Sequence, residues 1–203
     1  MPSSWTDGRD PLRLPGALLF IAVAQFIPAL AIAEALHPNY NVSSQPISDL
    51  GATCRTVSGV TSCSVVEPSA IIFDASVFLL GLLDLAAGYL IFERGEKVLS
   101  VVVAFAAVGA MGVGLFPETT GNVHLIASLV TFLFAGLSAI LSFRLVERPV
   151  SYLFAALGAA SLLALLLYAS STYLGLGQGG MERMIAYPEL LWSAGFGAYL
   201  MGA

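Results

Sequence analysis

Charged residues are scarce in this chain. They make up 10% of its 203 residues, whereas 58% are hydrophobic and the mean hydropathy is +0.88. A soluble domain carries about 25% charged residues, and a water-soluble chain this apolar could not cover its surface. The composition therefore predicts a single membrane domain over residues 1–203, folded as an all-α transmembrane bundle with the bilayer as part of its solvent.

Basic residues are few, and local catalytic signatures are missing. The eight Lys and Arg residues are scattered, and the net charge is −5, which excludes the basic patch typical of nucleic-acid binding. The sequence has no Gly-x-Ser-x-Gly elbow, no His-Glu-x-x-His, no Walker loop and no dinucleotide fingerprint. The corresponding hydrolase, zinc-protease and nucleotide-binding chemistries have no support in the sequence.

Histidine and cysteine are equally rare, with two of each. His37 and His124 lack a His-x-x-His spacing, so no metal site is predicted and the cofactor stays unknown. A site that combines both histidines with carboxylates remains open, although it rests on no spacing rule. Cys54 and Cys63 form no Cys-x-x-Cys motif, which argues against a redox relay.

Six apolar stretches predict six transmembrane helices, because about 20 helical residues cross a bilayer core. They cover residues 14–35, 68–92, 98–115, 123–143, 150–174 and 188–202, with a long polar loop at 36–67. The sixth stretch is short unless residues 184–187 extend it. The first stretch also resembles a cleavable signal peptide. We favour an uncleaved span, because its apolar run is long for a signal peptide.

The basic residues predict the orientation. One side of a six-span bundle would hold six of them, and the other side would hold two: Arg9, Arg13, Arg94, Lys97, Arg144 and Arg148 against Arg55 and Arg183. Cytoplasmic loops of membrane proteins carry an excess of Lys and Arg. Both termini are therefore predicted to face the cytoplasm in a multi-pass protein of the cell membrane.

The two cysteines fall in the loop 36–67, on the predicted outer side. Disulfides persist outside the cytosol, so a Cys54–Cys63 bridge is expected. It would restrain the unfolded chain by about 2–3 kcal/mol. Two free thiols are the alternative.

Ionisable residues also gather on the predicted outer side. Seven acids fall in outer loops or in the outer third of a span, together with both histidines: Glu34, Asp49, Glu67, Asp74, Glu118, Glu182 and Glu189. Asp84 would lie deeper. This concentration predicts an outward-facing polar vestibule lined by the loop 36–67, the turn 114–124 and the glycine-rich loop 175–187.

Two pairs of residues suggest chemistry in this vestibule. Glu118 and His124 could form an acid/base pair or two metal ligands, and the alternative is a solvated interfacial turn. Glu182 and Arg183 could form an anion site, because a guanidinium binds phosphate or carboxylate with two hydrogen bonds. The alternative for Arg183 is an internal salt bridge to one of the outer acids.

Three further residues have two readings each. Asp74, one to two turns below the outer surface, could be a proton or cation site, or it could form a buried hydrogen bond between helices. Asp84 has the same two possible roles, and for it we favour a buried hydrogen bond between helices. Tyr187 could contact a substrate or belong to an interfacial aromatic belt.

Short segments in all three outer regions resemble a known family. They are Pro46-Ile-Ser-Asp-Leu-Gly51, Gly114-Leu-Phe-Pro-Glu118 with Gly121 and His124, and Gly180-Met-Glu-Arg183 followed by Tyr187, Pro188 and Trp192. The chain thereby resembles the archaeal membrane family called domain of unknown function 998. The resemblance implies a six-helix membrane protein of archaeal origin with no settled activity. It also emphasises Ser48, Asp49, Glu118, His124, Glu182, Arg183 and Tyr187.

Three classes of function fit these residues. The first is a membrane-embedded enzyme that acts on a lipid or isoprenoid from the outer side. In that enzyme His124 would be the base, oriented by Glu118 or Asp49, and Arg183 would bind an anionic lipid headgroup. The second is a transporter or small-ligand receptor that uses Asp74. The third is an accessory subunit whose polar loops bind a partner.

Overall fold

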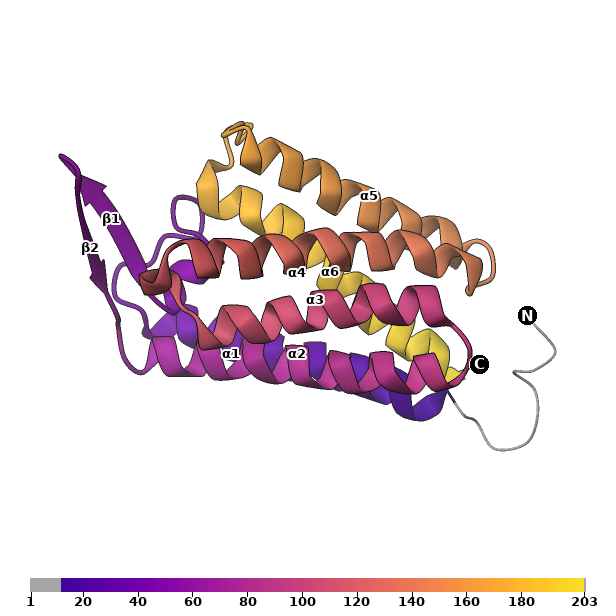
Figure 1. Ribbon diagram of the computed structural model, residues 1–203. Coiled ribbons are helices and arrows are strands. Elements are labelled where there is room, and N and C mark those ends of the chain that lie inside the picture. Colours follow the sequence, from indigo (N-terminus) through magenta and orange to yellow (C-terminus); the bar gives the residue numbers. More distant parts are fainter. Residues whose placement is uncertain (1–11, 203) are drawn as a thin grey trace.

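The protein is a bundle of long helices that lie side by side (Figure 1). The computed structural model describes residues 12–202, so Arg9 of the predicted cytoplasmic set lies outside it. Within that range the chain forms six α-helices: α1 Arg13–Leu36, α2 Ser69–Glu93, α3 Lys97–Leu115, α4 Asn122–Leu141, α5 Val150–Ala169 and α6 Gly177–Gly202. The all-helical prediction for the bundle is confirmed.

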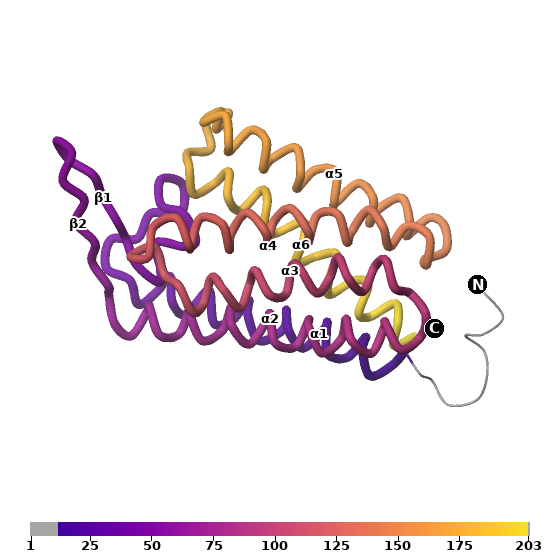
Figure 2. Tube along the Cα trace, in the orientation of Figure 1, coloured from indigo at the N-terminus to yellow at the C-terminus, as the bar shows by residue number. Residues whose placement is uncertain are grey.

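The helices form a closed ring in sequence order. Each helix packs against the next one along the chain, α6 returns to pack against α1, and α4 also contacts α6. The turns after α2 and α4 lie at one end of the bundle, here called the turn end, together with the last residues of α6 (Figures 1 and 2). The opposite end, here called the hairpin end, carries two short strands.

Five helices in the described part of the chain are long and apolar enough to cross a membrane: α1, α2, α3, α4 with the turn after it, and α5. Their outward faces carry large apolar side chains, among them Ile21 of α1, Leu125 of α4 and Leu166 of α5, each more than half exposed. A water-soluble bundle would present polar groups there. The chain is therefore a multi-pass membrane protein.

The largest departures from the predicted boundaries concern the last two helices. α5 ends at Ala169 rather than 174, and α6 begins at Gly177 rather than 188. The glycine-rich segment suggested a loop, but its glycines serve close packing. A Cβ on Gly177 would collide with the backbone of Ser43, and one on Gly179 would collide with the backbone of Gln45. Glycine lets the loop 36–67 lie directly on the first turns of α6.

The loop 36–67 contains regular structure that its composition did not predict. A 3₁₀ turn, η2 (Ile47–Leu50), precedes the antiparallel strands β1 (Thr53–Val57) and β2 (Val60–Ser64). Cys54 and Cys63 are directly opposite partners in this hairpin, and they form the expected disulfide. The bridge therefore crosslinks two neighbouring strands rather than two distant parts of the chain.

The ring closes through glycines at the contact between α1 and α6. A Cβ on Gly16 would lie 2.6 Å from the carbonyl oxygen of Gly197, and a Cβ on Gly197 would lie 2.6 Å from that of Gly16. Backbones this close exclude any larger residue at either position. In a membrane, where apolar side chains gain little by leaving lipid, such close packing is a main source of helix association.

Candidate functional site

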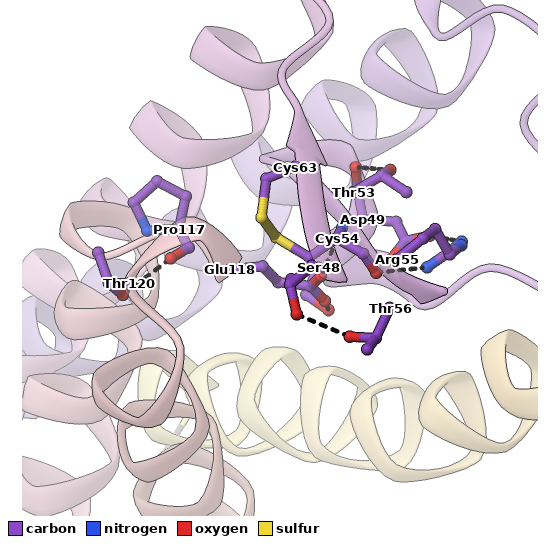
Figure 3. Close-up of a disulfide and its surroundings, with 11 residues drawn as sticks. Ser48, Asp49, Thr53, Cys54, Arg55, Thr56, Cys63, Pro117, Glu118 and Thr120 are labelled. Carbon is purple, nitrogen blue, oxygen red and sulfur yellow. Dashed lines mark hydrogen bonds and ion pairs between the residues drawn. A yellow bond between two sulfur atoms is a disulfide. The ribbon is translucent and has the colours of Figure 1, made fainter. Parts of the chain in front are cut away.

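Glu118 joins the turn after α3 to the loop 36–67. It begins η3 (Glu118–Thr120), and it accepts hydrogen bonds from Ser48 Oγ at 2.8 Å and from the backbone N–H of Cys54 at 3.4 Å (Figure 3). Burial raises the pKa of Glu118 above its ordinary value of 4.5, the nearby Asp49 raises it further, and the Ser48 bond opposes both effects. Ser48 and Glu118 are thus brought together at the hairpin end.

Asp49 is buried beneath the hairpin, with 1% of its surface exposed. Its Oδ2 accepts from Arg55 at 2.6 Å and from Gln45 at 3.4 Å, and Arg55 reaches it from β1 (Figure 3). Its Oδ1 has no hydrogen-bond partner within residues 12–202. The Arg55 contact explains why a carboxylate is tolerated in this buried position.

His124 is buried in the first turn of α4. Its Nδ1 lies 2.8 Å from the carbonyl oxygen of Phe116, and its Nε2 lies 3.3 Å from Ser128 Oγ. A carbonyl can only accept, so Nδ1 carries a proton, and in the neutral ring Nε2 accepts from Ser128 Oγ. Among residues 12–202, His124 and Glu118 form no direct hydrogen bond with each other. The expected acid/base pair is therefore not preassembled.

Glu182 lies within α6, not in a loop, and is buried. Its Oε2 accepts the backbone N–H of Ile47 at 2.5 Å, which fixes η2 on the helix. Since Ile47 precedes Ser48, this contact connects Glu182 with the Ser48 and Glu118 pair. Ser48, Asp49, Glu118 and Glu182 therefore gather around η2, and we call these four residues the polar network.

Arg183 is also buried, and its side chain is occupied by internal partners. Its Nη2 donates to Glu34 Oε1 at 2.6 Å and to the Tyr40 hydroxyl at 2.8 Å. Its Nη1 donates to three backbone carbonyl oxygens: Val42, Gln45 and Gly179. The internal salt bridge, which was the alternative for Arg183, is present here. Its Nε has no hydrogen-bond partner among residues 12–202. An anionic ligand at Arg183 remains a prediction, and it would have to reach this buried Nε or displace the acceptors at the two Nη atoms.

Tyr40 was not among the predicted site residues. Burial raises the pKa of its phenol well above the ordinary value of 10.0, so the hydroxyl keeps its proton. It donates to the Pro46 carbonyl at 2.7 Å while it accepts from Arg183. Its sequence context, a lone tyrosine in a polar loop, gave no signal that it would join Arg183 to the loop.

The structure leaves the other two predicted binding residues apart from this network. Tyr187 is 42% exposed on α6. Asp74 lies in α2 against the backbone of Gly51, and its buried Oδ1 finds no partner in the part of the chain that is described. Among residues 12–202 no group of three or more His, Cys, Asp or Glu side chains could hold a metal ion.

An interior cavity of about 100 Å³ lies beneath this polar network. Its lining begins with Ile47, Ser48 and Glu182 at the hairpin end and continues along α1, α2, α3, α4 and α6 into the bundle. On α6 the lining residues Glu182, Ala186, Glu189 and Ser193 are spaced by three or four positions, so they form one face of the helix. At 1.5 Å per residue this face extends about 16 Å along the bundle.

The deep part of the cavity contains a carboxylate that was expected elsewhere. Glu189 was predicted in the outer third of a span, but α6 begins earlier, so Glu189 lies at the middle of the helix. It is buried and accepts from Ser161 Oγ of α5 at 2.6 Å. Asp84 of α2 and Ser193 line the same cavity. Neither Glu189 nor Ser193 was a predicted site residue. Residues 175–187 were predicted to be a loop, so the three- and four-residue spacing of the cavity-lining residues on α6 was not recognised.

Comparison with known proteins identifies a family and nothing more specific. Residues 20–199 match the family model described as protein of unknown function (DUF998). No curated protein and no solved structure matches the chain. The family match covers all six helices in whole or large part, together with every site residue described above.

Proposed function

The chain belongs to the DUF998 family of proteins of unknown function, and we propose that it binds part of a lipid or isoprenoid chain in the cavity inside its helical ring. The observation that carries the proposal is the continuity of the cavity. Its lining joins polar groups at the hairpin end, Ser48 and Glu182, to a mostly apolar wall that includes Phe26, Val77 and Phe132, with Asp84, Glu189 and Ser193 deeper in the bundle. A ligand whose apolar chain separates two polar groups has the same sequence of chemistry.

The proposal includes a sixth span and an orientation. α6 closes the ring between α1 and α5, so it would cross the membrane with the other five although it carries Glu182, Arg183 and Glu189. The turns after α2 and α4 hold Arg94, Lys97, Arg144 and Arg148, which supports a cytoplasmic turn end. The hairpin end would then be the outer vestibule of a cell-membrane protein, and the archaeal origin stays a prediction.

The cavity gives the ligand hypothesis better support than the enzyme hypothesis. Catalysis by His124 would require Nε2 to exchange Ser128 for a substrate, and Glu118 is already engaged by Ser48 and Cys54. Binding in the cavity requires no such rearrangement. Its volume admits one slender chain segment rather than a whole lipid, so the remainder of the ligand would extend toward the hairpin end.

Blocking the cavity tests the proposal. Ala106 of α3 and Ala135 of α4 line it, so Ala106→Phe and Ala135→Phe would each place a ring in the space of the ligand. Ala156→Phe, at an exposed position of α5, is the matched control. We expect native mass spectrometry to find retained lipid in the wild type and the control, and at least tenfold less in the blocked variants. Equal retention in all four proteins would refute the proposal.

A further inference from the structure

The wall of the cavity has charges of one sign only. Its ionisable groups are three carboxyls, those of Asp84, Glu182 and Glu189, and no Lys, Arg or His occurs among its described lining residues. The other polar groups are mainly hydroxyls of Ser and Thr. Sites for anionic headgroups present basic donors, whereas this wall presents acceptors. The composition of the wall therefore selects against an anionic group inside the cavity.

Asp84, Glu189 and Ser193 lie at similar depth. Both α2 and α6 begin at the hairpin end (Figure 1). Asp84 is 15 residues along α2 from Ser69, which is about 22 Å, and Ser193 is 16 residues along α6 from Gly177, which is about 24 Å. Glu189 is one helical turn above Ser193 on the same face. Two carboxyls and one hydroxyl therefore share the deep half of the cavity.

Part of the hydrogen-bonding capacity at this depth is unused. Ser193 is 6% exposed, and its Oγ has no partner among residues 12–202. Asp84 Oδ1 is likewise buried without a partner in the described chain. Buried polar atoms nearly always have a hydrogen-bond partner. Asp84 Oδ1 can only accept and Ser193 Oγ can accept as well, so both face the cavity with acceptor capacity that a hydrogen-bond donor could use.

We propose that the deep half of the cavity binds a protonated primary amine that carries a short apolar group. An ammonium has three donors and no acceptor, which matches the oxygens of Asp84, Glu189 and Ser193. Its positive charge would compensate the carboxylates in a medium where an unpaired charge is costly. The inference rests on the proposed function for the existence of a ligand in the cavity, and it adds the chemistry of the group at its deep end.

Three probes with one apolar body separate the possible head groups: hexylamine, hexanol and hexanoate. The chain has two tryptophans, Trp5 and Trp192, and Trp192 lines the cavity. In a Trp5→Phe protein in lipid nanodiscs, a saturable change in fluorescence would therefore report binding near Trp192. We expect hexylamine to bind at least tenfold more tightly than hexanol, as a charge-assisted bond predicts, and hexanoate to bind most weakly.

Matched variants assign the binding to the three residues. Asp84→Asn and Glu189→Gln should each weaken hexylamine binding about tenfold or more, whereas Glu147→Gln, at an exposed acid outside the lining, should leave it unchanged. Ser193→Ala removes an oxygen that has no partner in the described chain. It should keep the melting temperature while it weakens hexylamine binding several-fold, so this variant tests the proposal even if a carboxylate variant fails to fold.

The outcomes separate this inference from the proposed function. Equal binding of hexylamine and hexanol would refute the proposal that the deep half binds an amine, and so would unchanged binding in the Asp84, Glu189 and Ser193 variants. Neither result would refute the proposal that the cavity binds a ligand. Saturable binding of hexylamine alone would support both. If none of the three probes binds saturably, and no lipid is retained by the purified wild type, both fail.

Discussion

Arg183 Nη2 of α6 donates to Glu34 Oε1 of α1 across 2.6 Å. The arginine side chain is 6% exposed and the glutamate 23%, so the pair is largely removed from water. It connects the last helix of the ring to the first, at the end opposite the Gly16 and Gly197 contact. The position predicted for an anionic ligand is therefore also a point where the fold is held together.

Removing the carboxylate of this pair should destabilise the protein. Glu34→Gln leaves the buried guanidinium without its counter-charge, and we expect the free energy of unfolding to fall by about 3 kcal/mol. Chemical denaturation in detergent, followed by circular dichroism, measures the change. Glu147→Gln, at an exposed acid, should change it by less than about 0.5 kcal/mol. Equal stability of the two variants would mean that the pair adds nothing to the fold.

The disulfide should protect the hairpin from proteolysis. Replacing Cys54 and Cys63 by serine removes about 2–3 kcal/mol of restraint on the open hairpin, so trypsin should cleave after Arg55 roughly tens of times faster. Gel analysis of cleavage times measures the effect. A Thr56→Ser, Thr61→Ser protein, which keeps its hydroxyls in the same hairpin, is the control. Unchanged cleavage in the cysteine-free protein would contradict the prediction.

Glu118 should make stability fall as the pH rises. Burial raises its pKa in the folded protein above 4.5, so the folded state binds a proton more tightly than the unfolded state does. Its contribution to stability is fully present below about pH 4.5 and is lost as the pH rises through the folded pKa. The melting temperature of the wild type, relative to Glu118→Gln, should therefore decline as the pH rises above about 4.5. Parallel profiles of the two proteins would show that the pKa is not raised.

His124 should contribute to stability through its bond to the turn. His124→Ala leaves the Phe116 carbonyl without its imidazole donor, and we expect a loss of about 1–2 kcal/mol in the free energy of unfolding. Ser128→Ala, which removes the longer contact at Nε2, should cost less. If His124→Ala leaves unfolding unchanged and abolishes a measured turnover, the catalytic hypothesis for His124 gains support over the structural one.

The sequence was most informative where one property decided the outcome. The scarcity of charge predicted apolar helices, and the shared loop of Cys54 and Cys63 predicted their bridge. Both predictions are confirmed, because neither depends on contacts between distant segments. Ser48 and Glu118 also meet, although the sequence predicted only that they lie on the same side of the membrane and not that a hydrogen bond joins them.

The predictions from the sequence were wrong where one residue type can serve two structural purposes. Glycine at 177 and 179 reads as a loop signal, but here it permits a loop to lie on a helix. The error shortened α6 and moved Glu189 from the middle of a helix to its edge. For Arg183 the difficulty was different, because its partners Glu34 and Tyr40 come from segments more than 140 positions away, and no local spacing could choose between them and a ligand.

The closure of the ring also sets an order of events during biosynthesis. α6 leaves the ribosome after α1 to α5, and it supplies Glu182, Glu189 and Arg183 to an interior that the first five helices leave open on one side. Until α6 packs against them, Glu34 has no guanidinium partner and the cavity wall formed by α1 to α4 stays open. A ribosome stalled before residue 177 would therefore present an unfinished bundle with an uncompensated acid, a feature that membrane quality-control proteases could use to distinguish it from the completed protein.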